Sequence, residues 1–364
     1  MKKSRVLFVI NTLDRGGAER SLINTFCEKD FSDRQVDLLV LTGKARLIDE
    51  VPEYVHLLNK HTYRSRIGLF FRCLYAVFYR GYIFRRFRYF AGNFIRMIRE
   101  RRFLADKLLW EAIALSAPAA EGCYDEAIAY TEGGSAYYVA EGADALKKTA
   151  LIHIDMQMAG YCRNLDLDHY DRFDSIGAAS EDARISFLNE YPELTERTFL
   201  FDNPLNVNRI ETMSHLDTGI HFNTDGLRIF TAERLVEQKA CDVSVRAASI
   251  MKEKGIKFEW IVAGNGHEKG NLKRLIRKLS LTDEFILTGE IDNPYALMKE
   301  CDVYVQATSY EGKSMSVREA LALGKPVIVS DRSGNSIKAD RETVVALSPD
   351  GIAEGIIAFQ ENRE

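Results

Sequence analysis

Short apolar runs alternate with helical patterns along most of the chain. Such uninterrupted apolar strands are typical of a parallel sheet that helices cover on both faces. In the first half, six runs predict strands at residues 5–10, 36–41, 125–130, 149–154, 174–180 and 197–202. In the second half, five runs predict strands at residues 227–232, 258–264, 284–289, 302–308 and 326–331. The pattern therefore predicts an α/β chain with two Rossmann-like domains.

The segment Asn203–Gly226 separates the two sets of strands. It is rich in turn residues and has little strand character, so we expect domains at residues 1–205 and 206–364. A length of 364 residues is also more than one core usually serves. Ligands of open parallel sheets bind beyond the carboxyl ends of the strands. Two such sheets facing across a cleft would therefore place a ligand among their strand-to-helix loops.

Composition narrows the functional class. The formal net charge of −4 excludes a globally basic nucleic-acid-binding protein. The six cysteines are scattered, without a CxxC pair or a histidine-rich cluster, so neither a structural zinc nor a disulfide framework is indicated. Reduced cysteines in a cytosolic protein are the default expectation. The apolar run Val6–Ile10 is too short for the core of a signal peptide and suits a first buried strand.

A basic and aromatic segment, residues 64–102, lies in an expected helical insertion at about residues 64–120. It holds eleven arginines against one acidic residue, Glu100, with Phe and Tyr between them. Arg72 and Arg80 interrupt its apolar run, which argues against a transmembrane helix. On a helix, one side would carry arginines and the other apolar residues: Arg85, Arg88, Arg96 and Arg99 against Phe87, Phe90, Phe94, Met97 and Ile98.

This two-sided pattern favours an interfacial helix on an anionic membrane surface. One alternative is a helix that packs on its own domain with its arginines in solvent. Nucleic acid is a third candidate partner, but no DNA- or RNA-binding motif accompanies the patch, so we expect none.

Two loops that follow predicted strands carry candidate phosphate ligands. Gly16 and Gly17 lie between the first strand and the first helix, where glycine lets backbone amides approach a phosphate. The alternative is an ordinary tight turn. Arg234 and Lys239 follow the first strand of the second half, and their two cations suit a diphosphate. Surface charge alone would also explain this pair.

A third loop, VAGNGHEKG, spaces Gly264, Gly266 and Gly270 as GxGxxxG between a strand and a helix. This spacing resembles a dinucleotide fingerprint, but it lies in the middle of a sheet rather than on the first strand of a domain. A tight turn that faces the base or ribose of a nucleotide is the favoured interpretation.

The fourth loop is the stretch SYEGKSMSVREALALGKPVIVSD, in which Glu311 and Glu319 stand eight positions apart around a helix start. Free amides at such a start suit an anion, and ionised carboxylates accept hydrogen bonds from sugar hydroxyls. Glu311 and Glu319 could therefore bind the two sugars of a nucleotide-sugar on either side of its diphosphate. The alternative is structural, since Ser316 and Glu319 have the S-x-x-E spacing of a capping box.

The ordered set ERLVEQKA, VAGNG, LTGEIDNPYALMKECDVYVQAT and YEGKSMSVREALALGKPVIVSD resembles the retaining glycosyltransferases of GT-B fold, family 4. It covers most of residues 227–331. More loosely, GGAER and the segment around LIHID resemble members that build bacterial surface polysaccharides. The resemblance implies two Rossmann-like domains, a UDP- or GDP-linked sugar bound mainly by the second domain, and no metal or other cofactor.

The resemblance also implies roles for single residues. Arg234 and Lys239 would hold the donor diphosphate, Glu311 would contact the donor sugar, and Glu319 would bind ribose. His153 would lie on the acceptor side, and Gly16 and Gly17 would close on the diphosphate from the first domain. The remaining donor-binding candidates are Gly264, Gly266, Gly312, Lys313, Ser314 and Met315.

The chain departs from the family pattern at Glu233 and Ala240, which replace glycines, and at EGKS, which replaces EGFG. The expected activity is transfer of a sugar to a lipid-linked or surface-polysaccharide glycan, on the cytoplasmic face of the cell membrane. The alternatives are a nucleotide-sugar epimerase of similar fold and a non-catalytic scaffold that binds a partner. Intact Arg234, Lys239, Glu311 and Glu319 argue against the scaffold.

Overall fold

The protein is described from a computed structural model. The described residues are 3–14, 16–42, 45–58, 71, 91, 94, 95, 98, 105–157, 159–161, 163–166, 168–310, 314–332 and 341–363. They divide into two compact units, Met1–Pro204 and Leu205–Glu364.

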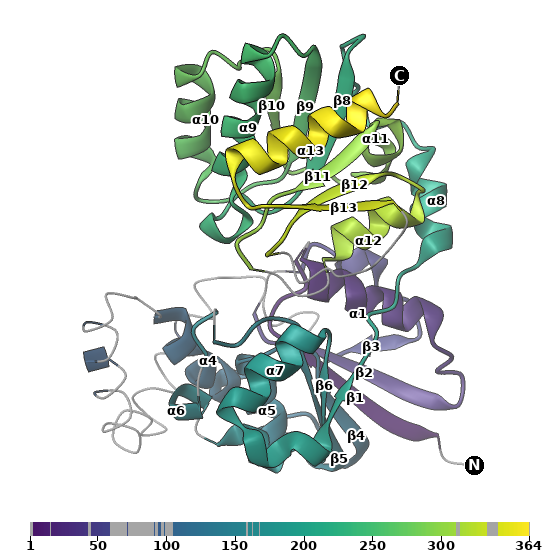
Figure 1. Ribbon diagram of the computed structural model, residues 1–364. Helices are drawn as coiled ribbons and strands as arrows, with labels where there is room; N and C mark the ends of the chain where they lie inside the picture. Colours follow the sequence, from purple (N-terminus) through teal and green to yellow (C-terminus); the bar gives the residue numbers. More distant parts are fainter. Residues whose placement is uncertain are drawn as a thin grey trace. The chain divides into compact units, whose positions relative to one another are not determined.

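The first unit contains a seven-stranded parallel sheet in the order β3-β2-β1-β4-β5-β6-β7 (Figure 1). Its strands are β1 Ser4–Ile10, β2 Arg34–Val40, β3 Val55–Leu57, β4 Tyr124–Ala129, β5 Ala145–Ile152, β6 Ser175–Ala178 and β7 Thr198–Leu200. Within the described residues, its α-helices are α1 Gly17–Glu28, α4 Ala105–Ser116, α5 Gly134–Gly142, α6 Arg163–Asp166 and α7 Glu181–Glu190. Short 3-10 turns occur at Ile48–Glu50, His169–Arg172 and Pro192–Arg197.

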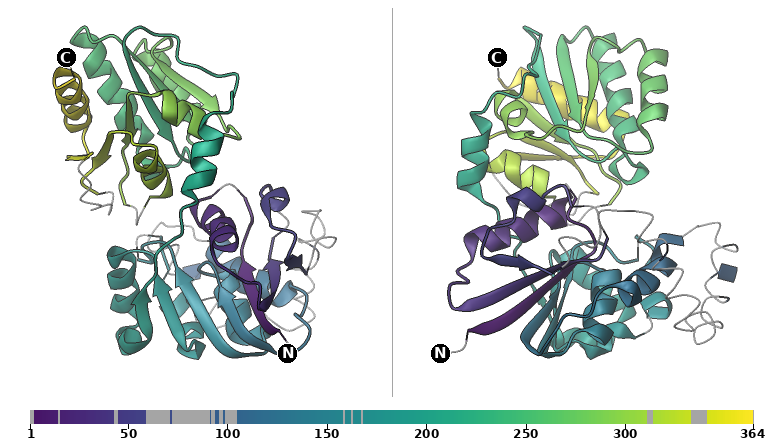
Figure 2. Two further views of the ribbon diagram at one scale, coloured as in Figure 1. Left: turned by 90° about the vertical axis from the view of Figure 1, so that its right-hand side faces the viewer. Right: turned by 180° about the vertical axis from the view of Figure 1, so that it is seen from behind.

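The second unit contains a six-stranded parallel sheet in the order β10-β9-β8-β11-β12-β13 (Figure 2). Its strands are β8 Leu227–Ala232, β9 Phe258–Ala263, β10 Phe285–Gly289, β11 Val303–Gln306, β12 Val327–Ser330 and β13 Glu342–Val345. Its α-helices are α8 Val207–Ser214, α9 Cys241–Glu253, α10 Lys269–Lys278, α11 Tyr295–Glu300, α12 Met315–Ala322 and α13 Pro349–Glu361. A short 3-10 turn, η4, spans Glu237–Lys239.

Each sheet has an apolar cluster on both faces, which explains the uninterrupted apolar runs. In β1, Phe8 and Ile10 belong to one cluster, while Leu7 and Val9 belong to another. In β8, Ile229 and Phe230 are divided in the same way. Because successive side chains of a strand point to opposite faces, a strand buried on both sides must be apolar throughout.

All eleven predicted strands are present, and the fold prediction of two parallel, Rossmann-like sheets is confirmed. Two further strands, β3 and β13, were not predicted. Most of the basic segment 64–102 lies outside the described residues, including Arg85, Arg88, Arg96 and Arg99. Among the described residues, no helix combines the length and apolar character needed to cross a membrane.

Asp302 joins the beginnings of β8 and β11. Its carboxylate accepts two hydrogen bonds from the Arg228 guanidinium, at 2.7 and 3.1 Å, and one from the Arg228 backbone N–H at 2.9 Å. The Arg363 guanidinium, just after α13, lies 2.8 Å from the same carboxylate. Burial acts to raise the pKa of Asp302, but these hydrogen bonds outweigh it and lower the pKa to about 2.

We predict that Asp302→Asn lowers the free energy of unfolding at pH 7 by about 2 kcal/mol, the range for hydrogen bonds to a charged group. A carboxyl pKa that is lower in the folded state adds stability above the unfolded value of about 4, and this stability is lost as pH falls toward 2. Urea unfolding should therefore show a difference between wild type and variant that shrinks as pH falls below about 4. A difference that stays constant to acid would contradict the assignment.

Candidate functional site

The centre of the second sheet is a topological switch point. β8 pairs in parallel with β11 on one side and with β9 on the other. From β8 the chain builds outward through β9 and β10, whereas from β11 it builds in the opposite direction through β12 and β13. Loops that leave two such strands diverge and open a crevice at the carboxyl ends. The predicted diphosphate ligands follow β8, and the predicted sugar ligands follow β11.

Gln238 connects these two loops. Its backbone carbonyl accepts a hydrogen bond from the Ser309 N–H at 2.8 Å, and its side-chain amide donates to the Tyr310 carbonyl at 2.8 Å. The Thr308 hydroxyl also donates to the Gln238 carbonyl at 3.1 Å. The turn that carries Lys239 is therefore fixed to the segment that leads directly to Glu311.

Arg234 and Lys239 lie in different environments within their loop. Lys239 ends η4 and is buried, with 6% of its surface exposed. Arg234 is exposed, and its guanidinium makes no hydrogen bond or ion pair within the described residues. An exposed guanidinium keeps its donors available for a phosphate. The structure thus places both predicted cations at the switch point.

Gly264 and Gly266 are explained by close backbone packing. A Cβ atom on Gly264 would lie 1.7 Å from the Glu233 carbonyl oxygen, and one on Gly266 would lie 2.0 Å from the Leu235 carbonyl oxygen. The Leu235 N–H also donates to the Asn265 carbonyl at 3.0 Å. The two glycines therefore support the loop that carries Arg234. A Cβ atom on Gly270 would meet no atom within 4 Å, so the third glycine of the spacing has no such constraint.

Ala240 occupies a left-handed backbone conformation, with φ +45° and ψ +35°, between η4 and α9. The Cβ atom makes this conformation costly by about 1–2 kcal/mol for residues other than glycine. The structure thus gives a physical reason for a glycine after the lysine, although this chain has alanine there. The connection from η4 to α9 adopts this conformation with alanine at position 240.

The capping-box interpretation of Ser316 and Glu319 is wrong. Helix α12 begins after Ser314, and no side chain caps it among the described residues. The hydroxyls of Ser314 and Ser316 instead donate to Oε1 of Gln306, in β11, at 3.0 and 3.1 Å. Gln306 therefore binds the hydroxyls that could have capped the helix.

Glu319 is buried within α12, with 1% of its surface exposed. Its Oε1 accepts a hydrogen bond from the Tyr295 hydroxyl at 2.9 Å. Met315, the first residue of α12, is also buried. Glu311, Gly312 and Lys313 lie outside the described residues, so their predicted roles remain predictions.

The first sheet has its own switch point, between β1 and β4. Asn11, after β1, donates to the Glu132 carbonyl at 2.6 Å and accepts from the Ser135 N–H at 2.8 Å, so it ties the two loops together. Gly16 and Gly17 lie at the start of α1, as predicted. The Glu19 carboxylate lies against Gly16, where an added Cβ atom would be 2.1 Å from Oε2. A phosphate bound at this helix start would have to displace that carboxylate.

His153 follows β5, and its ring packs on the rings of Tyr130 and Phe201, with centroid distances of 5.4 and 5.3 Å. Burial lowers the pKa of His153 to about 4, against the opposing effect of the Tyr130 backbone, so its ring is neutral at pH 7. Its Nε2 makes no hydrogen bond within the described residues. A neutral imidazole can give or accept one hydrogen bond to a substrate hydroxyl.

Glu132 is a candidate site residue that sequence reasoning missed. Its carboxylate is buried and accepts hydrogen bonds from the backbone N–H groups of His153 and Ile154, the latter at 3.1 Å. It thereby holds the loop that carries His153. The sequence could have indicated Glu132. It lies in TEGGS, which follows a predicted strand and contains a glycine pair like Gly16 and Gly17.

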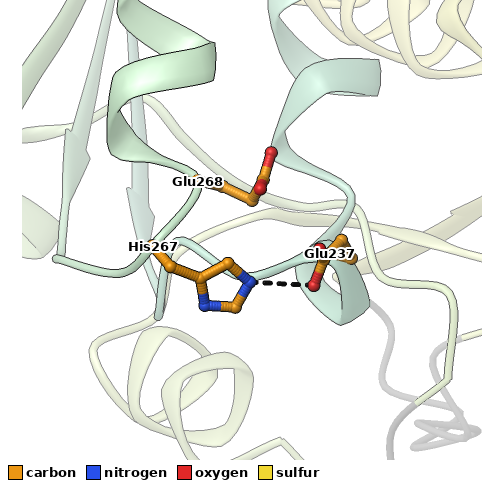
Figure 3. A group of neighbouring side chains, drawn as sticks. All are labelled: Glu237, His267 and Glu268. Carbon is orange, nitrogen blue, oxygen red and sulfur yellow. Dashed lines mark hydrogen bonds and ion pairs between the residues drawn. The ribbon is translucent and has the colours of Figure 1, made fainter. Parts of the chain in front are cut away.

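Glu237, His267 and Glu268 form the one group among the described residues whose ligand atoms could converge on a metal ion (Figure 3). Glu237 and His267 are 77% and 62% exposed, and His267 Nε2 lies 2.9 Å from Glu237 Oε2. The hydrogen bond from His267 lowers the pKa of Glu237. A hydrogen bond between two exposed side chains accounts for the closeness of Glu237 and His267.

Comparisons with known proteins show which family and which proteins this chain resembles. Residues 217–364 match the family described as glycosyl transferases group 1. The putative glycosyltransferase EpsF of Bacillus subtilis is 24% identical over 351 residues, which cover 95% of this chain and 84% of EpsF.

Two further proteins extend the comparison. A Campylobacter jejuni N-acetylgalactosaminyltransferase, named for a diphospho-undecaprenol-linked acceptor, is 29% identical over 108 residues, or 30% of this chain and 29% of that protein. Anabaena HepE in complex with UDP-glucose superposes with a TM-score of 0.69 at 14% identity, over 99% of this chain and 90% of HepE. At this identity, the similarity to HepE supports the fold alone.

These matches confirm two predictions. The structural neighbours are glycosyltransferases of two Rossmann-like domains, so the GT-B fold is confirmed. The prediction of a glycosyltransferase is confirmed, because residues 217–364 match the group 1 glycosyltransferase family model and the full-length relative is named a glycosyltransferase. The matched residues include Arg234 and Lys239, in the loop after β8, and Glu319, in α12.

We predict that Gly264→Ala and Gly266→Ala each lower the free energy of unfolding of the second unit by about 1–3 kcal/mol, because their Cβ atoms would collide with backbone oxygens. Gly270→Ala is the matched control. It should raise stability by up to about 1 kcal/mol, since it adds a better helix former in open space. Chemical unfolding of the three variants measures the difference. Equal effects at all three positions would refute the packing explanation.

Proposed function

We propose that this chain is a retaining glycosyltransferase that moves a sugar from a nucleoside-diphosphate sugar to a lipid-linked or surface-polysaccharide glycan. The observation that carries the proposal is the pair of cations at the switch point: exposed Arg234 and buried Lys239, on a loop that Gln238 fixes to the segment before Glu311. The family match supports transfer over the epimerase alternative. The name of the Campylobacter jejuni relative supports a lipid-linked acceptor.

The chemistry that these residues can perform is stabilisation of a leaving group. Negative charge develops on the diphosphate when its bond to the sugar breaks. Fixed cations aimed at this charge stabilise the transition state without reorganisation. Arg234 and Lys239 supply that charge, and amides at the start of α12 would add partial positive charge. Glu311 is assigned to the donor sugar, Glu319 to the ribose, and neutral His153 to hydroxyls on the acceptor side.

We predict that Arg234→Ala and Lys239→Met each cost about 2–4 kcal/mol in kcat/KM, the range for removal of one charge-stabilising group. Methionine is chosen for Lys239 because it fills a buried position that alanine would leave open. Lys254→Ala, at an exposed site after α9, is the control and should change nothing. Transfer from a radiolabelled UDP- or GDP-sugar measures the effect. Kinetics within twofold of wild type for the first two variants would remove them from the site.

We expect activity to survive EDTA, because Arg234 and Lys239 can supply the positive charge that a metal ion provides in other transferases. His267→Ala tests the remaining candidate metal group and should leave the rate within about twofold of wild type. The measurement is initial rate after dialysis against EDTA. Loss of activity that Mg²⁺ or Mn²⁺ restores would show that the charge has been assigned to the wrong groups.

We further propose that residues 64–102 dock the enzyme on an anionic membrane surface. Phe94 and Ile98, from the expected apolar face, are 48% and 63% exposed. Each basic residue near an anionic surface contributes about 1 kcal/mol, and salt screens the attraction. Changing Arg85, Arg88, Arg96 and Arg99 to glutamine should therefore abolish co-sedimentation with anionic vesicles at low salt while donor binding persists. Equal sedimentation of wild type with neutral vesicles would exclude electrostatic docking.

A further inference from the structure

A buried hydrogen bond joins α11 to α12. The Tyr295 hydroxyl, on the first residue of α11, donates to Oε1 of Glu319 at 2.9 Å. Tyr295 and Glu319 are 3% and 1% exposed. Tyr295 belongs to the same apolar cluster as Val317 and Ala320 of α12, so apolar packing accompanies the hydrogen bond.

The backbone of Tyr295 is also anchored. Its N–H donates to the Asn293 side-chain oxygen at 3.1 Å, and the Asn293 amide donates to the Met213 carbonyl in α8 at 2.7 Å. The start of α11, which carries the phenol, is therefore held to α8 through Asn293. A hydrogen bond between such fixed partners limits how the carboxylate can rotate.

The bond also has an electrostatic consequence. Burial of a carboxylate is costly unless hydrogen-bond donors compensate it. The hydrogen bond that the Tyr295 hydroxyl donates to Glu319 offsets part of this cost. An ionised carboxylate accepts only, and its two oxygens offer about four acceptor positions. The Tyr295 hydroxyl occupies one of these positions on Oε1 and thereby restricts the orientation of the carboxylate.

We propose that Tyr295 is a positioning residue for Glu319, and that the pair makes the site select nucleotides that carry ribose 2′ and 3′ hydroxyls. The inference rests on the proposed function, in which Glu319 binds ribose. Two neighbouring hydroxyls require a carboxylate in one orientation, because both must donate to it together. A site built to accept hydroxyl donors rejects an analogue that lacks them.

The test uses the full-length protein and calorimetric titration with UDP and with 2′,3′-dideoxy-UDP, or with the GDP pair if wild type binds GDP more tightly. Wild type should prefer the ribonucleotide by about tenfold or more, as expected for hydrogen bonds to a charged group. Tyr295→Phe should reduce that preference to about threefold or less, mainly by weakening the ribonucleotide. In the Glu319→Gln background, Tyr295→Phe should have no further effect on the preference, since coupled residues are not additive.

Thr231→Val is the matched control, because it also removes a buried side-chain hydroxyl from the second unit, one that contacts the Val305 carbonyl and the Trp260 side chain. It should lower the melting temperature and leave the ribonucleotide preference unchanged. If Tyr295→Phe weakens both nucleotides equally, or retains the full preference, Tyr295 has a structural role only and the inference is overturned. If wild type binds neither UDP nor GDP, the proposed function fails first, which is a distinguishable result.

Discussion

The parallel pairing of β8 with β11 is the constraint on which the candidate site depends. It places the first strand of the second sheet beside the fourth, so that the loops after them diverge from neighbouring positions. Asp302 holds the opposite ends of the two strands together through Arg228, and Gln238 holds the two loops together at the carboxyl ends. Without this adjacency, Arg234 and Glu319 would be unrelated side chains.

Around this centre, several residues that the sequence predicts as donor ligands also make contacts that stabilise the fold. Gly264 and Gly266 allow two loops to pack backbone to backbone, which brings Arg234 to the switch point. Ser314 and Ser316 are bound to Gln306, and Glu319 to Tyr295. These structural contacts are compatible with ligand binding, because side chains that are already ordered lose less conformational entropy when the ligand binds. The proposed transferase activity therefore depends on a layer of buried polar contacts beneath the loops.

Much of the fold could be predicted from the sequence, because continuous apolar runs report burial on both faces of a sheet. The missed strands, β3 and β13, lack that signal: β3 has three residues, and the residues of β13 are exposed or half-buried. The capping-box alternative fails for a different reason. Local spacing made Ser316 a candidate cap, but its hydroxyl donates to Gln306 in the preceding strand. The Tyr295 contact spans 24 residues and two helices, so spacing could not reveal it.

The most direct test of the account is amide hydrogen exchange with and without a saturating nucleoside diphosphate, UDP or GDP. The central claim is that the diphosphate binds at the β8–β11 switch point. The account predicts slower exchange in residues 234–240 and at the start of α12, with smaller changes in α10 and α13. Protection confined to the edge strands or to the exposed Glu237–His267 surface, with no change around Arg234 and Met315, would contradict it.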